Sequence, residues 1–250
     1  FRLDRGIAEG GMGRVYLGFD LSLQRPVAVK VIRPEYASEQ SFTARFVREA
    51  RAQAQLVHPN VVQVFYVGQE GPTLFMVMEL VEGGSLADQL RASGPLDWKT
   101  AHRHLTALAH GLEEGARLGI VHRDIKPDNV LVTRSGRVKL ADLGLVRLAV
   151  DDAGHSVAEG TSMILGTPMY MAPEQWVTPD VGPTADVWAL GATLWFLLAG
   201  EEAFDSRDGN YPRVMKQIVL QPFPDLRKHR DDVPEGVLAV LAKATAKNAD

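Results

Sequence analysis

The chain has 250 residues and no cysteine, and its 27 basic and 31 acidic side chains give a formal net charge of −4. Its content of 46% apolar and 23% charged residues is typical of a globular domain and excludes a disordered chain, a coiled coil and a disulfide scaffold. A mildly acidic chain is a poor candidate for nucleic-acid binding, and the longest uncharged apolar run, Val187–Gly200, is too short to span a bilayer. We therefore expect a soluble cytoplasmic domain without a membrane segment, although segments outside these residues could anchor the full-length protein.

The N-terminal part of the chain predicts strands and one helix. Apolar and polar residues alternate over Val15–Phe19, as in a half-buried strand. Apolar residues recur at helical spacing over Ser41–Leu56, which predicts an amphipathic helix. The other strands that we expect are Val27–Ile32, Val61–Val67 and Leu74–Leu80.

Helices dominate after Glu82-Gly83-Gly84-Ser85, which breaks the strand pattern and predicts a hinge. The expected helices are Leu86–Ala92, Trp98–Leu118, Thr184–Ala199, Tyr211–Val219 and Glu235–Ala246, and a short strand pair is expected at Val130–Thr133 and Val138–Ala141. The pattern predicts an α+β fold with two lobes, a small β-rich lobe with one helix (residues 1–81) and a larger helical lobe (residues 85–250).

Gly10-Gly11-Met12-Gly13 lies between two expected strands, where glycine lets backbone N–H groups approach a phosphate closely. A plain hairpin turn is the alternative explanation. A dinucleotide-binding fold requires a helix after the glycines, whereas Arg14–Phe19 predicts a strand. No Gly-Lys-Ser/Thr follows, so the loop is not a Walker loop. A glycine hairpin over phosphates remains as the functional interpretation.

Two charged residues occupy positions where apolar side chains are expected. Lys30 lies within an apolar strand, and Glu49 lies on the apolar stripe of the predicted helix. Either long side chain alone could reach water from a buried stem. Because an unpaired buried charge is costly, two opposite charges on inner faces of neighbouring elements predict a Lys30–Glu49 ion pair near the glycine loop.

Charged residues cluster in His122–Asn129 and again at Asp142. If Ser135-Gly136 is a two-residue hairpin loop, the register places Asn129 opposite Asp142, about 5 Å apart by backbone geometry. Two hard oxygen ligands at this spacing suit Mg²⁺ shared with phosphates, and Asp124 in the adjoining loop is a candidate base. The alternative is an ordinary solvated loop.

These motifs together resemble the eukaryotic-type (Hanks-type) serine/threonine protein kinase catalytic domain, especially its bacterial receptor-kinase-like branch with a Gly-Gly-Met-Gly loop. The resemblance covers essentially the whole chain as a single catalytic domain, with its hinge at about residues 79–84. It implies a two-lobed fold, binding of ATP and Mg²⁺ (or Mn²⁺), and transfer of the γ-phosphoryl group to serine or threonine hydroxyls of protein substrates. It also implies phosphorylation of the chain itself, in trans within a homodimer.

The resemblance assigns roles to individual residues. The implied catalytic residues are Asp124 as base, Lys126 on the γ-phosphate, and Lys30 with its partner Glu49. The implied ATP-binding residues are Ile7, Ala8, Gly10, Gly11, Gly13, Val15, Ala28, Lys30, Met78, Glu79, Val81 and Leu131. The implied metal ligands are Asn129 and Asp142. The implied residues of the activation segment and its regulation are Thr161, Ser162, Thr167, Glu174, Arg45, Arg123 and Arg147, with Thr161 as the first choice of phosphate acceptor.

Three features depart from the family pattern. Ala8 replaces the first glycine of the loop, which adds one methyl group and is compatible with ATP where φ is negative. Leu143 replaces the usual phenylalanine after Asp142 and conserves apolar packing. The chain ends at Asp250, before the arginine that normally pairs with Glu174, so we expect the last helix to be missing.

Two other functions compete with an active protein kinase. A catalytically silent, nucleotide-binding scaffold is supported only by Ala8, because Lys30, Asp124, Asn129 and Asp142 are all present. A small-molecule kinase would lack the activation segment that ends here in Ala172-Pro173-Glu174. The three histidines of the helix 98–118 are spaced for different faces and do not predict a metal site; they are His102, His104 and His110.

Overall fold

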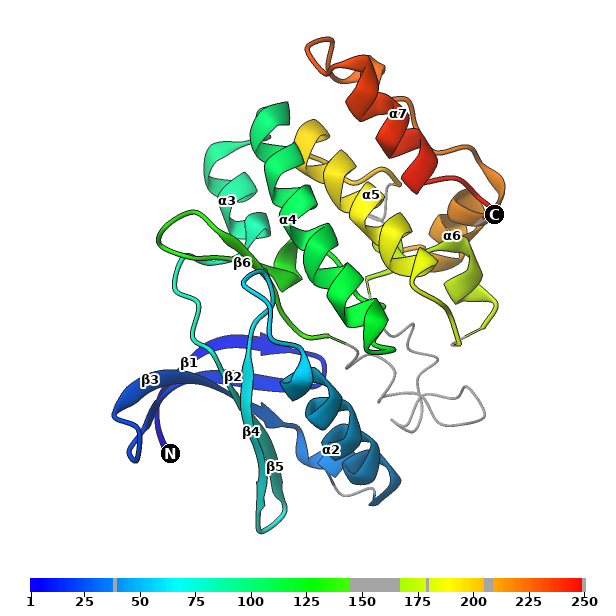
Figure 1. Ribbon diagram of the computed structural model, residues 1–250. Coiled ribbons are helices and arrows are strands. Elements are labelled where there is room, and N and C mark those ends of the chain that lie inside the picture. The colour runs from blue at the N-terminus through cyan, green and yellow to red at the C-terminus, as the bar shows by residue number, and fades with distance from the viewer. Residues whose placement is uncertain (38–39, 144–166, 179, 205–208, 249–250) are drawn as a thin grey trace.

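The computed structural model describes residues 1–37, 40–143, 167–178, 180–204 and 209–248. A five-stranded sheet with one long and one short helix forms the N-terminal lobe, and the later helices form the larger lobe, as Figure 1 shows. The predicted α+β fold with two lobes is therefore confirmed. Within these residues, no helix combines the length and apolar character that a membrane span requires.

The sheet is antiparallel and its strands lie in the order β1-β2-β3-β5-β4. The strands are β1 (Arg2–Gly10), β2 (Gly13–Asp20), β3 (Arg25–Ile32), β4 (Val64–Glu70) and β5 (Thr73–Met78). Strand β3 is central, so Lys30 is flanked by Val15 on one side and by Met76 on the other. The lysine is consequently only 7% exposed.

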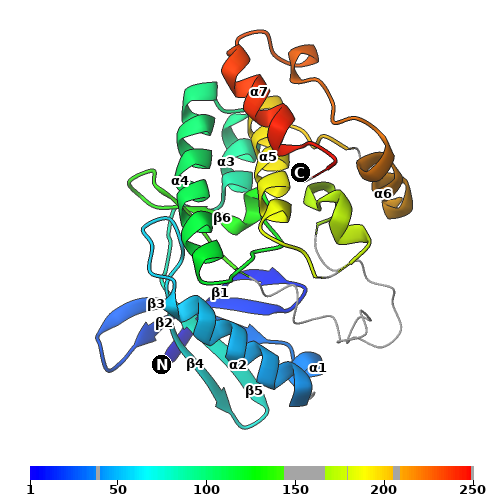
Figure 2. The same ribbon diagram turned by 45° about the vertical axis from the view of Figure 1, so that its right-hand side comes forward.

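Helix α2 (Gln40–Gln55) packs against the sheet, and the short helix α1 (Pro34–Ala37) precedes it (Figure 2). The apolar stripe of α2 is buried, as the sequence predicts. Phe42 and Phe46 are fully buried, and their rings stack with centroids 6.3 Å apart. These rings pack with Leu74 and Met76 of β5, and this burial fixes the helix on the sheet.

The helices of the larger lobe are α3 (Leu86–Ser93), α4 (Trp98–Arg117), α5 (Thr184–Ala199), α6 (Tyr211–Leu220) and α7 (Glu235–Ala244). Helix α5 contacts α4 and α7 and carries Trp195, which is 1% exposed in the largest core cluster. Ser85 begins α3 with a reciprocal capping box with Asp88, and Asp97 caps α4. Ser85, the last residue of the predicted hinge, thus begins a helix where the strand pattern ends.

The hairpin of β6 (Val130–Val132) and β7 (Val138–Leu140) differs from the prediction by one residue of register. Val130 pairs with Leu140, and the amide of Ala141 donates to the carbonyl of Asn129 at 2.8 Å, so Asn129 is not opposite Asp142. The reason is that the loop has three residues and not two. The amide of Thr133 bonds the carbonyl of Arg137, and Gly136 takes a left-handed φ of 77° that closes the longer turn.

Candidate active site

The loop between α4 and β6 brings together the predicted base and its neighbours. The Lys126 ammonium lies 3.0 Å from Oδ2 of Asp124 and donates to Oγ1 of Thr167 at 2.7 Å. The side-chain amide nitrogen of Asn129 donates to the same oxygen, Oδ2, at 2.9 Å and also to the backbone carbonyl of Asp124. Lys126 and Asn129 therefore both hold the Asp124 carboxylate.

Asp186, on the first turn of α5, fixes the backbone just before Asp124. Its two carboxylate oxygens accept hydrogen bonds from the amides of His122 and Arg123, both at 2.8 Å. Burial raises the pKa of Asp186, although these hydrogen bonds oppose the shift. Arg123 has a φ of 68°, which is rare for a residue with a side chain, so the carboxylate holds a backbone that is otherwise unfavourable.

The predicted ion pair between Lys30 and Glu49 is not present. The Lys30 ammonium instead lies 2.7 Å from Oδ1 of Asp142, and Glu49 lies 3.4 Å from the guanidinium of Arg48 on the same helix. Sequence spacing placed both Lys30 and Glu49 on inner faces correctly, but it carries no information on the position of α2 along the sheet. The acidic partner of Lys30 comes from the other lobe.

Asp142 is suited to hold a metal ion together with Asn129. Its φ of 61° turns the chain sharply after β7, and its side chain is one-third exposed. Burial alone raises the pKa of Asp142, but the charge and hydrogen bond of Lys30 outweigh it and hold the pKa below its usual value. The amide nitrogen of Asn129 faces Asp124, which leaves its oxygen for a cation. These hard oxygen donors fit Mg²⁺.

Five of the predicted ATP-binding residues meet in one apolar cluster between the sheet and the β6–β7 hairpin. These are Val15, Ala28, Met78, Val81 and Leu131. These apolar side chains suit contact with a flat apolar ring, and the segment Met78–Val81 contributes two of them. Ile7 and Ala8 lie on β1, where every residue is exposed.

The glycine loop joins β1 and β2 as a hairpin, as predicted. At Gly13 a Cβ would lie 2.1 Å from the carbonyl oxygen of Val31, so only glycine fits there. At Gly10 and Gly11 the space is open. Arg33 fastens this loop to the end of β3, because its amide bonds the carbonyl of Met12 and its guanidinium bonds the carbonyl of Gly10.

Glu79 in the hinge is paired with Lys139 of β7 at 2.9 Å, and the Lys139 side chain is 11% exposed. The same ammonium lies 3.4 Å from the carbonyl of Val61. The pair ties the hinge to the hairpin that precedes Asp142. Sequence reasoning placed Glu79 in the hinge but did not find this partner.

Part of the predicted activation segment lies outside the described residues, namely Thr161, Ser162 and Arg147. Thr167 is described and bonds Lys126. Glu174 accepts a long hydrogen bond of 3.5 Å from the hydroxyl of Thr184. Gln175, which no sequence pattern singles out, donates to the carbonyl of Arg123 and accepts from the amide of Ala172, so it joins the end of this segment to the loop of Asp124.

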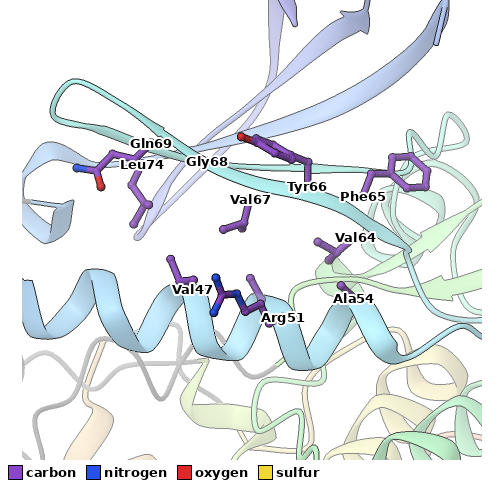
Figure 3. A pocket seen from close by; sticks show the side chains of 11 residues that line it. Val47, Arg51, Ala54, Val64, Phe65, Tyr66, Val67, Gly68, Gln69 and Leu74 are labelled. Atoms are coloured by element: carbon purple, nitrogen blue, oxygen red, sulfur yellow. The ribbon is translucent and has the colours of Figure 1, made fainter. Parts of the chain in front are cut away.

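A separate pocket of about 400 Å³ lies between α2 and β4, away from the site described above. Figure 3 shows its mainly apolar lining, with Val47, Arg51 and Ala54 along the helix and Val64 and Val67 on the strand. None of the predicted catalytic, ATP-binding or metal-binding residues lines it. The candidate site is therefore identified by its polar network and not by this cavity.

The three histidines of α4 lie on different faces of the helix, as their spacing predicts. His104 is 6% exposed, whereas His102 and His110 are exposed on other faces of the helix. Within the part of the chain that the structure describes, no group of three or more acidic, histidine or cysteine side chains is placed to hold a metal ion. This finding is compatible with the two-residue oxygen site of Asn129 and Asp142, which includes an amide.

The fold and this site define a class of protein, and comparison with known proteins agrees. The model of the protein kinase domain family matches residues 1–249, so the chain belongs to the protein kinase family. Membership implies the use of ATP and a divalent metal ion.

The chain has relatives in bacteria. It is 37% identical to the serine/threonine-protein kinase PknB of Mycolicibacterium smegmatis over 100% of the chain and 40% of that protein. It is 34% identical to PrkC of Bacillus subtilis, over 99% and 37%, and 38% identical to PknL of Mycobacterium tuberculosis, over 97% and 59%. The crystal structure of a mutant PknI kinase domain from Mycobacterium tuberculosis matches 99% of the chain and 87% of its own length, with a TM-score of 0.75 and 29% identity. The chain thus spans well under two-thirds of the length of the full-length relatives.

Proposed function

We propose that this chain is the catalytic domain of a serine/threonine protein kinase that transfers the γ-phosphoryl group of ATP to serine or threonine hydroxyls of proteins. The observation that carries the proposal is the Asp124 carboxylate, held by Lys126 and Asn129 beside Thr167. A carboxylate in this setting accepts a proton from a hydroxyl, and a lysine beside it balances phosphate charge. The names of the relatives support serine and threonine as the acceptors.

The reaction needs little more than positioning and charge. The substrate hydroxyl loses its proton to Asp124 while its oxygen forms a bond to the γ-phosphorus, and the bond from that phosphorus to the bridging oxygen of ADP breaks. Lys126 contacts the γ-phosphate, and Lys30 contacts the phosphates nearer the ribose. Asn129 and Asp142 would hold Mg²⁺, which would supply charge neutralisation there, and Mn²⁺ is the alternative metal.

We infer that Lys30 and Glu49 change partners when nucleotide binds. The Lys30–Asp142 and Arg48–Glu49 contacts support this inference, because each uses a group that the reaction needs elsewhere. On this interpretation, phosphates replace Asp142 at Lys30, and α2 turns to bring Glu49 to the same lysine. The role of ATP supports a cytoplasmic location for this domain, and phosphorylation in trans requires two copies to meet.

The test is a phosphotransfer assay with purified protein, ATP and Mg²⁺, followed by mass spectrometry for phosphorylated residues. We expect phosphoserine or phosphothreonine in the wild type and a loss of about 10²- to 10⁴-fold in Asp124→Asn, which cannot accept the proton. Nucleotide binding by the wild type without any phosphorylation would favour a scaffold instead. Phosphorylation of a small molecule alone would favour a small-molecule kinase.

A further inference from the structure

Gln53 is a polar residue on the buried stripe of α2, near the C-terminal end of the helix. It lies one helical turn after Glu49 and is 6% exposed, on the face that also buries Phe46 and Leu56. A buried amide without a hydrogen bond is costly, so a glutamine at this position requires a partner. The partner is the carbonyl oxygen of Leu143, to which the side-chain nitrogen of Gln53 donates. A carbonyl can only accept, which fixes the orientation of the amide.

Leu143 directly follows the metal-ligand candidate Asp142. Its own side chain is 3% exposed and packs with Leu56 and Val61, so this part of the backbone is enclosed on the side of α2. On the other side of Asp142, the carbonyl of Ala141 is bonded at 2.9 Å by the ring of His122, which is fully buried. Two buried side chains therefore hold the residues on both sides of Asp142.

The two residues that form these hydrogen bonds, His122 and Gln53, come from different lobes. His122 belongs to the loop that carries Asp124, whereas Gln53 belongs to α2 and thus moves with Glu49. Between them Asp142 keeps a φ of 61°, which is unfavourable for a residue with a side chain and persists only where the surroundings determine it. The hydrogen bond from Gln53 is a direct connection between the position of α2 and the backbone of Asp142.

We propose that Gln53 is a positioning residue that aims the Asp142 carboxylate for metal binding and couples its orientation to helix α2. The proposal rests on the metal role of Asp142 in the proposed function. Loss of the amide donor frees the carbonyl of Leu143 and lets the backbone leave the strained conformation, so the carboxylate no longer meets Asn129 at the metal. Because Gln53 lies 90 residues from Leu143 in sequence, the contact depends on the packing of α2.

The test compares direct metal binding in wild type, Gln53→Met and the control Gln55→Met. Methionine matches the length of glutamine and suits an apolar stripe, and Gln55 is an exposed glutamine near the end of the same helix. Binding of Mn²⁺ is measured by electron paramagnetic resonance in the presence of a non-hydrolysable ATP analogue. We expect binding about 5- to 10-fold weaker in Gln53→Met, with an unchanged or higher thermal midpoint and unchanged affinity for the analogue without metal. Gln55→Met should bind Mn²⁺ as the wild type does.

A second variant, Gln53→Leu, also removes the donor and suits an apolar stripe, so it should weaken Mn²⁺ binding as much as Gln53→Met does. It decides the question if Gln53→Met does not fold. Equal Mn²⁺ binding in wild type and a folded Gln53 variant would overturn this inference alone. Equal losses of Mn²⁺ binding and metal-free analogue binding would show a purely structural role and overturn it as well. A wild type that binds the analogue but no Mn²⁺ would overturn the metal assignment and this inference together.

Discussion

The ammonium of Lys30 lies 2.7 Å from the carboxylate of Asp142, although 112 positions separate them in the sequence. One residue comes from the centre of the sheet and the other from the end of the β6–β7 hairpin, so this pair connects the two lobes across the site. It brings the proposed phosphate-binding cation and the proposed metal-binding anion into direct contact. The two groups neutralise each other in this contact, and on the proposed function phosphates and a metal ion would replace it.

The first prediction concerns the cation of this pair. Lys30→Met should lower kcat/KM for ATP by about 10²-fold or more, because positioning supplies most of the catalysis in phosphoryl transfer. It also leaves the carboxylate of Asp142 without its partner, so the pKa of Asp142 should rise from its depressed value. Steady-state kinetics test the first effect, with the exposed Lys99→Met as control. Near-normal turnover in Lys30→Met would refute the role.

The second prediction concerns the anion. Asp142→Asn should abolish metal-dependent turnover and leave the fold intact, because an amide oxygen still accepts a hydrogen bond from Lys30 and the side chain is one-third exposed. Activity is measured across a range of Mg²⁺ concentrations, with the thermal midpoint as the check on folding. Wild-type activity at the same Mg²⁺ concentration would show that Asp142 is not the ligand.

The third prediction concerns Asp186. Asp186→Asn offers one acceptor oxygen to two buried amides, so it should lower the free energy of unfolding by about 1–3 kcal/mol. It should also reduce kcat, since the loop of Asp124 loses its anchor. Urea unfolding measures the first effect, and the exposed Asp180→Asn is the matched control. An unaltered unfolding curve in Asp186→Asn would contradict the prediction.

The fourth prediction concerns activation. We expect phosphorylation at Thr161, or at Ser162, to raise activity several-fold, because a doubly charged phosphate can bridge arginines and order a segment. The expected arginines are Arg45, Arg123 and Arg147. Phosphatase treatment and a Thr161→Ala/Ser162→Ala double variant should each lower activity. If neither changes it, the switch lies elsewhere in the chain.

The fifth prediction concerns pH. Burial, assisted by the charge of Arg103, lowers the pKa of His104, so the unfolded chain takes up a proton before the folded chain as pH falls. The free energy of unfolding should therefore fall as pH drops through about 6.5, the value for an unfolded histidine. His104→Gln should show a smaller fall than the wild type, and His102→Gln on the exposed face should behave as the wild type. Identical pH profiles in wild type and His104→Gln would refute this origin.

Periodicity and short motifs predict much of this molecule. The pattern over residues 184–199 predicts a helix with the observed bounds, and the glycine hairpin, the strand of Lys30 and the buried stripe of α2 follow from local patterns. These features depend on residues close in sequence, whose spacing the sequence displays directly.

The errors arise where geometry depends on distant residues or on one turn. The register of the β6–β7 hairpin depends on whether its loop has two or three residues. One extra loop residue shifts every residue pair of the hairpin by one position. The partner of Lys30 depends on how α2 and the other lobe sit against the sheet. Gln53 could have been singled out as a polar residue within an apolar stripe, whereas the partners of Asp186 and Lys139 had no local signal.

The attachment of the glycine loop to Arg33 has a mechanical consequence. The amide and side chain of Arg33 hold Met12 and Gly10, while its carbonyl accepts the first amides of α1, from Tyr36 and Ala37. One residue is thus a shared pivot for the loop above the phosphates and for the segment leading into α2. A displacement of α1 would therefore reach Met12 and Gly10 through Arg33, so this helix and the loop that the proposed function places over the phosphates form one connected unit.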